Sequence, residues 1–304
     1  MAGEWEAKFS QWAQPPGDTE EARIQNAIKG IRDALDADAK LKSTTRVFVQ
    51  GSYRNRVNVR QDSDVDIGVL YTGSTFYPEY PQGTTDETFG NSESAYSVQE
   101  FKRQIYGALI ARFGTSGVTW GDKAFDVHAN TYRVDADVVP LFEHRRYNTD
   151  GSFLCGVELR PDSGGRIINW PEKLYPHWPA QHYEYAVSKN EATRRAFKGV
   201  VRILRKLRYV MEGEGSESAK DIKGFLVECL VHNAPNENFA HGSWEKCVRA
   251  VLCYLWSNTR EDATCQYWCE VSQLKYIFIG QPADQRAKVN KFLLDAWSYI
   301  GIVP

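Results

Sequence analysis

Residues 47–70 read VFVQGSYRNRVNVRQDSDVDIGVL, and the alternation in this stretch decides the fold of the first half of the chain. The pattern predicts a strand, a Gly51-Ser52 turn, a short polar segment and a second strand. Side chains two apart on a strand point to the same face, so Asp64 and Asp66 are expected to project together. Two adjacent carboxylates repel each other unless a cation lies between them. A solvated strand face would give the same D-x-D spacing, but the Gly-Ser turn favours a site for Mg²⁺ and a triphosphate. Carboxylates supply hard oxygen ligands, and the turn supplies exposed N–H groups.

A second strand-like segment, YRVDADVVPL at residues 132–141, carries a further pair of carboxylates. Asp135 and Asp137 share one face, and apolar residues occupy the other. Two-metal phosphoryl transfer uses carboxylates that bridge both ions and another that holds the ion activating the nucleophile. The sequence therefore predicts phosphoryl-transfer chemistry at this strand pair.

The order of these motifs resembles that of the DNA polymerase β-like nucleotidyltransferases: Gly-Ser, then D-x-D, then a distant Asp before an apolar pair and Pro. The match is strongest to the cGAS/DncV-like branch, the bacterial enzymes that make cyclic oligonucleotides, through GSYRNRVNVRQDSDVDIGV and DADVVP. The resemblance continues through GRIINWPEKLYPH, ATRRAFKGVVRILRKLR and IKGFLVECLVHNAPN, and spans residues 15–300. It implies an α+β fold with a mixed-sheet catalytic lobe, including an N-terminal spine helix, over residues 1–170. A helical lobe over residues 171–304 would close the nucleotide site in a central cleft.

The resemblance also implies a reaction and a set of roles. Asp64 and Asp66 would ligate two Mg²⁺ ions, which Mn²⁺ can replace, and Asp137 would ligate the ion that activates the attacking ribose hydroxyl. Gly51 and Ser52 would hold the β- and γ-phosphates. The enzyme would join two or three ribonucleoside triphosphates into a cyclic second messenger for a downstream effector in bacterial anti-phage defence.

Two other functions are compatible with parts of this pattern. A nucleotidyltransferase acting on an RNA or protein acceptor would keep the same metal site. A nucleotide-binding module without activity is disfavoured, because the chain retains all three carboxylates.

Composition limits the setting in which the protein works. The net charge is −2, so the chain has no overall positive charge that would attract long nucleic acid. This argues against a long nucleic-acid activator, whereas a regulatory protein partner stays possible. No apolar run is long enough to span a membrane, and the N-terminus lacks a signal-peptide pattern, so a cytoplasmic protein is expected. The six scattered cysteines form no C-x-x-C pair and are interpreted as buried free thiols.

Residues 189–211 are predicted to form the strongest helix, with one apolar stripe and many basic residues on its other faces. A solvated basic face explains most of these charges. The resemblance implies that a lysine on this helix contacts phosphate, which favours Lys198 first and Arg202 second.

Lys223-Gly224-Phe225 stands where the resembled family has a Ser-Ser-aromatic turn. Phe225 can stack on a base, an interaction of ~1–3 kcal/mol, or can belong to the core. The hydroxyls that touch phosphate in the family are missing, and Lys223 could substitute. The resemblance places Asn169 near the residue that selects the base, and an Asn can pair with a pyrimidine edge, which favours a uridine-containing product.

The rest of the sequence predicts further helices and strands and offers a few less favoured site residues. A helix is expected over 19–40 with Thr19 as its N-cap, and a helix with Ser97 as its N-cap is expected to end at Phe113. Residues 71–95 are expected to form a long loop, either a lid over the site or, as favoured here, a surface excursion. Strands are expected near 118–120, 124–128 and 132–139, a hairpin over 153–168, and helices over 222–232, 244–257, 264–279 and 283–300. His177 and His182 are not expected to act directly in chemistry, and Asp62 is assigned to capping the turn.

Overall fold

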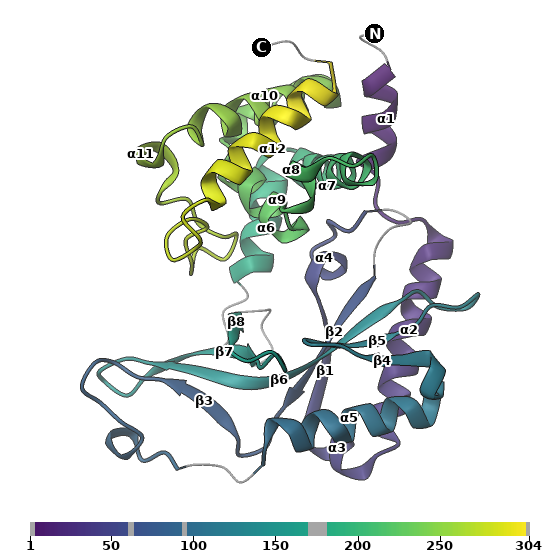
Figure 1. Cartoon of the computed structure of the whole chain (residues 1–304), viewed down its shortest axis with the longest axis vertical. Helices are drawn as coiled ribbons and strands as arrows, with labels where there is room; N and C mark the ends of the chain where they lie inside the picture. Colours follow the sequence, from purple (N-terminus) through teal and green to yellow (C-terminus); the bar gives the residue numbers. More distant parts are fainter. Residues whose placement is uncertain (1–3, 60–63, 93–95, 170–180, 302–304) are drawn as a thin grey trace. The chain divides into compact units, whose positions relative to one another are not determined.

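The computed structural model describes residues 4–59, 64–92, 96–169 and 181–301. The chain divides into two compact units (Figure 1). The sheet unit comprises Gly17–Arg54 and Ser63–Ala180, and the helical unit comprises Met1–Pro16, Asn55–Asp62 and Gln181–Pro304. The α+β class predicted from the sequence is confirmed. The predicted boundary at residue 170 lies outside the described residues. Two segments before it belong to the helical unit, because Phe9, Ala13 and Val57 are buried in its core.

A long central strand, β6 (Ala136–Tyr147), organises the sheet unit. Its first half pairs in parallel with β2 (Val65–Tyr71) and antiparallel with β5 (Phe125–Val127). Strand β1 (Thr45–Gln50) extends the sheet antiparallel to β2, and β4 (Val118–Trp120) extends it antiparallel to β5. The order β1-β2-β6-β5-β4 therefore places the two strands that carry the acidic motifs side by side.

The second half of β6 supports a smaller extension of the sheet. It pairs antiparallel with β7 (Phe153–Leu159) and in parallel with β3 (Phe76–Glu79), and β7 pairs with β8 (Ile167–Asn169). The predicted hairpin over 153–168 is thus confirmed. The expectation of a loop over 71–95 was wrong in part, because this segment contains β3 and the 3₁₀ helix η1 (Glu87–Phe89).

Helices cover one face of the sheet. The helices α2 (Asp18–Asp36) and α5 (Val98–Phe113) bury their apolar stripes against alternate residues of β2, β5 and β6. Ser97 caps α5 as predicted, and Glu100 completes a capping box, since each side chain accepts from the other residue's N–H. Thr19 is not a cap, because α2 begins one residue earlier with Gly17 at its N-cap. The short helices α3 (Ala39–Thr44) and α4 (Gly51–Arg54) flank β1, and η2 (Thr115–Gly117) precedes β4.

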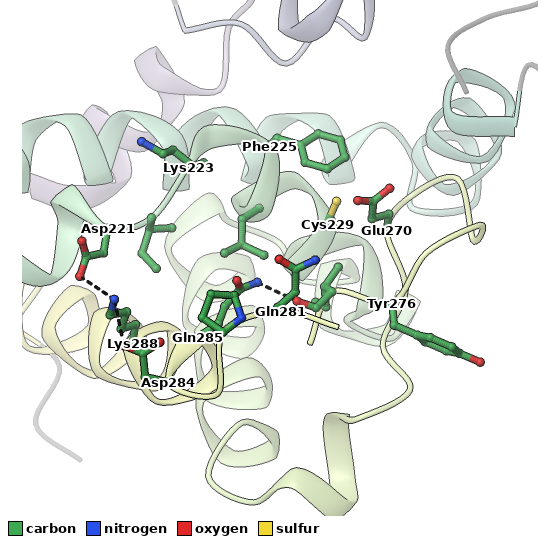
Figure 2. A pocket seen from close by; sticks show the side chains of 14 residues that line it. Asp221, Lys223, Phe225, Cys229, Glu270, Tyr276, Gln281, Asp284, Gln285 and Lys288 are labelled. Carbon is green, nitrogen blue, oxygen red and sulfur yellow. Dashed lines mark hydrogen bonds and ion pairs between the residues drawn. The ribbon is translucent and has the colours of Figure 1, made fainter. Parts of the chain in front are cut away.

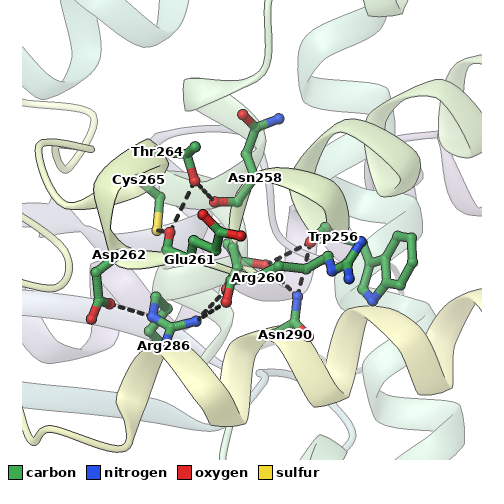
Figure 3. A network of polar contacts seen from close by, with 10 residues as sticks. Trp256, Asn258, Arg260, Glu261, Asp262, Thr264, Cys265, Arg286 and Asn290 are labelled. Carbon is green, nitrogen blue, oxygen red and sulfur yellow. Dashed lines mark hydrogen bonds and ion pairs between the residues drawn. The ribbon is translucent and has the colours of Figure 1, made fainter.

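The helical unit is built around a single apolar core that α7 crosses. Its described elements are α1 (Glu4–Trp12), α6 (Gln181–Ala192), α7 (Ala196–Gly213), α8 (Glu217–Lys220), α9 (Gly224–Asn233), η3 (Asn236–Phe239), α10 (Trp244–Asn258), α11 (Asp262–Cys265) and α12 (Gln285–Tyr299). Figure 3 shows how α12 secures the end of α10. Arg286 donates to the carbonyls of Thr259 and Arg260 at 2.7 and 2.8 Å, and Asn290 donates to Trp256 O at 2.8 Å. These bonds satisfy carbonyls that a helix end leaves unpaired.

Two helix predictions differ from the structure. The segment 189–211 is not one helix, because the chain breaks between α6 and α7, where Arg194 and Arg195 have positive φ angles. The segment 264–279 is not helical beyond α11, and an isolated bridge pairs Cys269 with Tyr276 instead. Local apolar spacing indicated helix in both places, but tertiary context overrides local propensity.

Other expectations concern membranes and cysteines. No helix in the described residues has the length and apolar character needed to cross a membrane. All six cysteines are free thiols; Cys229, Cys247 and Cys265 are buried, whereas Cys253 is exposed and Cys155 and Cys269 are half-buried. The expectation of buried thiols therefore holds for only part of the set.

Candidate active site

A row of carboxylates crosses three neighbouring strands of the sheet unit. Asp66 on β2 lies directly beside Asp137 on β6, and Asp126 on β5 lies directly beside Asp137 on its other side. Residues in register on adjacent strands point to the same face of a sheet. The three side chains therefore share the face opposite the helix-covered core, which takes the alternate residues Val65, Ile67 and Val138.

The negative charges in this row disturb one another. Burial raises the pKa of Asp137 to about 6, and the nearby charges of Asp64, Asp126 and Asp135 add to the effect. The pKa of Asp64 is also raised, first by loss of surrounding water and then by Asp135 and Asp126, although its side chain keeps solvent-exposed surface. Like charges held this close favour protonation or a bound cation.

Within the residues that the structure describes, the carboxylate of Asp135 has a hydrogen-bond partner and that of Asp137 has none. The carboxylate of Asp135 accepts the N–H of Ala129 at 2.6 Å, and its backbone carbonyl accepts the N–H of Val65 at 3.1 Å. Asp135 thus closes the turn before β6 and aligns β2 with β6. This engagement favours Asp137 over Asp135 as the functional carboxylate of the DADVVP motif.

Gly51 brings backbone directly against the acidic row. Its φ of 67° lies in the left-handed region, and a Cβ there would lie 1.9 Å from Oδ2 of Asp66. Only glycine fits such a position, because any side chain would overlap the carboxylate. The Gly51-Ser52 turn at the start of α4 therefore lies beside Asp66, as the motif spacing predicted.

The donor set suits a hard divalent cation, since it consists of carboxylate oxygens whose mutual repulsion a cation would relieve. As the side chains stand, the described residues contain no group of three or more His, Cys, Asp or Glu in a metal-binding arrangement. The row is thus an acidic surface that fits a metal chemically without forming a closed ligand cage.

Asp126 was missed by sequence reasoning. It lies in the short strand FDV, within AFDVHAN, where a single Asp carries no motif. Its proximity to Asp137 depends on the antiparallel pairing of β5 with β6, which no local pattern reveals. The only signal was its place on an alternating strand.

The helical unit contributes a second charged feature, at the N-terminus of α9. The guanidinium of Arg205 packs against Gly224, where a Cβ would lie 3.0 Å from both Nε and Nη2. Arg205 is only 7% exposed, and its Nε has no hydrogen-bond partner among the described residues. Helix α9 begins at Gly224, and the side chain of its N-cap Lys223 makes no capping bond. A buried cation beside an uncapped helix N-terminus favours an anion such as phosphate.

The two basic residues that the sequence favoured have other surroundings. Lys198 is buried, and its ammonium lies 5.5 Å from the ring centre of Tyr183. Arg202 is buried and donates from Nε to Ala13 O and from Nη1 to Arg56 O, each at 2.6 Å. Burial lowers the pKa of Arg202 to about 10. Helical spacing alone could not show that Arg205, from the same basic run, meets the turn before α9.

The ring of Phe225 is available for stacking. It is 45% exposed and lies 5.7 Å from the ring of His182 in a stacked arrangement, while His182 contacts Glu228 at 3.2 Å. Phe225 also stands at the rim of a cavity of about 300 Å³ that Glu270 and Tyr276 help to line (Figure 2). Phe225 is therefore not a core aromatic.

Four further residues considered from the sequence are Asn169, His177, His182 and Asp62. Asn169 ends β8, is exposed, and lies beside Val157 of β7. His177 and Asp62 lie outside the described residues. His182 has the ring and carboxylate contacts of a structural histidine.

Comparison with known proteins shows which chains this one is similar to. A family model for the cGAS/DncV-like nucleotidyltransferase C-terminal helical domain matches residues 184–301. A cyclic dipyrimidine nucleotide synthase of Cecembia lonarensis is 38% identical, with 99% of both chains covered. One of Legionella pneumophila is 39% identical over the same shares. A cyclic dinucleotide synthase of Elizabethkingia meningoseptica, solved with GTP and Apcpp, superposes with a TM-score of 0.79 at 30% identity, covering 97% of this chain and 98% of that one.

Proposed function

Because the chain belongs to the cGAS/DncV-like nucleotidyltransferase family, we propose that it joins two ribonucleoside triphosphates, at least one of them a pyrimidine nucleotide, into a cyclic dinucleotide. Its class is that of the cyclic nucleotide synthases, enzymes that release pyrophosphate as each phosphodiester bond forms. The product would act as a second messenger that a downstream effector reads in anti-phage defence.

The acidic row beside Gly51 is the observation that carries this proposal. Asp66 and Asp137 lie in register on adjacent strands, and the glycine backbone meets Asp66 so closely that no side chain fits. A triphosphate held by the Gly51-Ser52 turn would thus have its reacting phosphate next to the carboxylates. Enzymes catalyse phosphoryl transfer mainly by positioning the reacting groups and by stabilising charge electrostatically.

The three aspartates named from the sequence are the proposed metal ligands. Asp64 and Asp66 would hold the ions on the triphosphate, and Asp137 would hold the ion next to the attacking hydroxyl. Two Mg²⁺ ions, or Mn²⁺ in their place, would lower the pKa of that hydroxyl and offset charge on the leaving pyrophosphate. The raised pKa of Asp137 supports this assignment, because the fold keeps a carboxylate where its own charge is disfavoured.

In this proposal the sheet unit and the helical unit each carry a phosphate contact, and the helical unit also carries a base contact. Gly51 and Ser52 hold phosphate through the turn, and Arg205 with the N-terminus of α9 supplies the donors that the missing hydroxyls would have provided. Phe225 stacks on a base, since its ring is exposed and already oriented by His182. Lys198 stays a further candidate for phosphate, whereas the bonds of Arg202 to two carbonyls favour a structural role.

Base choice is inferred from relatives and from one residue. The two curated relatives at 38% and 39% identity are both cyclic dipyrimidine nucleotide synthases. Asn169 is exposed at the end of β8, and its amide can pair with the edge of a uracil. Uridine is therefore the proposed base in at least one position of the product.

The test is incubation of purified protein with all four ribonucleoside triphosphates and Mg²⁺ or Mn²⁺, followed by phosphatase treatment and mass spectrometry. Asp64→Ala/Asp66→Ala protein is the control, because it keeps the fold's other contacts and loses two proposed ligands. A phosphatase-resistant cyclic dinucleotide containing uracil or cytosine, absent from the control, is expected. A purine-only product would contradict the base assignment, and a linear or acceptor-linked product would contradict cyclisation and favour the acceptor-directed alternative.

A further inference from the structure

The break between α6 and α7 holds two consecutive arginines in an uncommon backbone conformation. Arg194 and Arg195 have φ angles of 53° and 69°, in the left-handed region that residues other than glycine rarely occupy. Such positions persist only where surrounding structure imposes them, and they concentrate at ligand-binding sites.

Local hydrogen bonds impose this conformation. The N–H of Arg194 donates to Glu191 O at 3.0 Å, and the N–H of Arg195 donates to Asn190 O at 2.6 Å. The side chains of Thr193 and Asn190 then accept the N–H groups of Phe197 and Lys198, each at 3.1 Å. The N-terminus of α7 is thus capped from within the chain, and the break itself needs no ligand to form.

The result is that both guanidinium groups face outward without a partner. Arg194 and Arg195 are exposed, and neither side chain makes a hydrogen bond or ion pair with any residue in the described ranges. Both line a cavity of about 900 Å³ formed by the α6–α7 break, η3 and the start of α10. We call it the arginine cavity. His241 and Ser243 also line it.

The acidic residues on the wall of the arginine cavity are already engaged. The carboxylate of Glu6 accepts the N–H groups of Trp244 and Glu245, at 3.1 and 2.8 Å, and so caps α10. Burial lowers the pKa of Lys189, and the nearby negative charge of Glu237 partly opposes this shift. Of the charged side chains on this wall, the two arginines are those with no hydrogen-bond or charged partner in the described part of the chain.

We propose that the arginine cavity binds a small anion with at least two phosphate groups, a nucleotide or a polyphosphate. Guanidinium groups bind phosphate through two parallel N–H donors, and two neighbouring arginines can engage two phosphates at once. The site goes beyond the proposed synthase function, because it contains none of the aspartates, the Gly-Ser turn or Arg205. It gives the helical unit a means of responding to nucleotide or polyphosphate levels.

The test is calorimetric titration of inorganic tripolyphosphate into Asp64→Ala/Asp66→Ala protein in EDTA, which removes metal-dependent binding at the aspartates. We expect Arg194→Ala/Arg195→Ala in that background to weaken one binding event by at least about tenfold, the effect of losing one charge-assisted hydrogen bond. Arg205→Met, in the same background, reports any binding at the start of α9 separately. Arg103→Ala, which removes an exposed arginine of α5, is the matched control and should leave binding unchanged.

A second variant separates binding from folding. Arg194→Gly/Arg195→Gly relieves the left-handed backbone, so it should raise the unfolding midpoint while losing the same affinity. Tripolyphosphate binding that persists in both double variants, or that is absent from the parent protein at millimolar concentration, overturns the proposal. Neither result bears on cyclic dinucleotide synthesis, which the product assay measures independently.

Discussion

Gly51 is the residue at which the backbone comes closest to the chemistry. We expect Gly51→Ala to lower kcat/KM by about a hundredfold or more, since a displacement of ~1 Å in a positioned group can cost that much. The added methyl would overlap Oδ2 of Asp66 and move the carboxylate or the turn. The measurement is pyrophosphate release under saturating Mg²⁺.

Gly90→Ala is the matched control for this substitution. Gly90 has the same φ of 67°, but a Cβ there would meet no atom within 4 Å. Both variants carry the same backbone strain, so only the overlap with Asp66 distinguishes them. Equal losses of activity in the two variants would refute the positional role of Gly51.

The pKa of Asp137 predicts how metal binding depends on pH. Its folded value of about 6 lies above the ordinary value of 3.8, so protons compete with metal below about pH 6. We expect metal affinity, measured by calorimetry, to fall as pH drops through that range. Asp126→Asn removes one neighbouring negative charge and should move the fall to lower pH by up to about one unit. An unchanged pH profile in this variant would contradict the coupling.

The same shift affects stability without metal. A carboxyl whose pKa is raised on folding stabilises the folded state fully below its unfolded pKa. That contribution is lost as pH rises through the folded value of about 6. Metal should therefore stabilise the protein most above pH 6, where the carboxylates are ionised.

At the scale of elements, α7 holds two other segments of the helical unit in place. Arg202 bonds the carbonyls of Ala13 and Arg56, and Arg56 follows the Gly51-Ser52 turn in the chain. We expect Arg202→Met to cost about 2–5 kcal/mol, because two charge-assisted bonds are lost inside the core. We also expect it to raise KM for triphosphate and to increase hydrogen exchange over residues 51–59.

Arg208→Met is the control for this prediction. Arg208 is also a buried arginine of α7, but it bonds Glu212 and Ala219 O, far along the chain from the turn. It should lower stability without changing KM or exchange over residues 51–59. If both variants raise KM equally, Arg202 acts on the fold alone and not on the turn.

At the scale of the whole molecule, substrate should stabilise the fold more when metal is present than when it is absent. A ligand at a hundred times its Kd adds about 2.7 kcal/mol to the free energy of unfolding. We expect uridine triphosphate with Mg²⁺ to raise Tm, and Asp66→Asn to abolish the part that depends on Mg²⁺. Arg205→Met should reduce the remaining shift. A full shift in Asp66→Asn protein would remove the aspartates from the proposed site.

Several features of the fold were readable from short stretches. Alternation placed Asp66 and Asp137 on one face of two strands, whereas Asp64 stands just before β2, and Ser97 with Glu100 marked the start of α5. Other features were not. One continuous helix was predicted over 189–211, because the apolar stripe continues through the break between α6 and α7. In the structure, the side chains of Thr193 and Asn190 instead cap the start of α7. The prediction of a helix over 264–279 was wrong for the same reason. The spacing of apolar residues does not show which backbone groups hydrogen-bond to one another.

The sequence by itself determined the motifs on which the proposed chemistry depends: strand alternation and the Gly-Ser turn are local, because each depends on residues within a few positions of one another. Only the tertiary structure decided which distant groups meet. Pairing of β5 with β6 placed Asp126 beside Asp137, and packing of α7 against α9 placed Arg205 at Gly224 while Arg202 went to two carbonyls. These contacts join residues far apart in the chain. The identity of a side chain does not show which distant residue it will meet, because burial and hydrogen bonding in the folded chain select the partner.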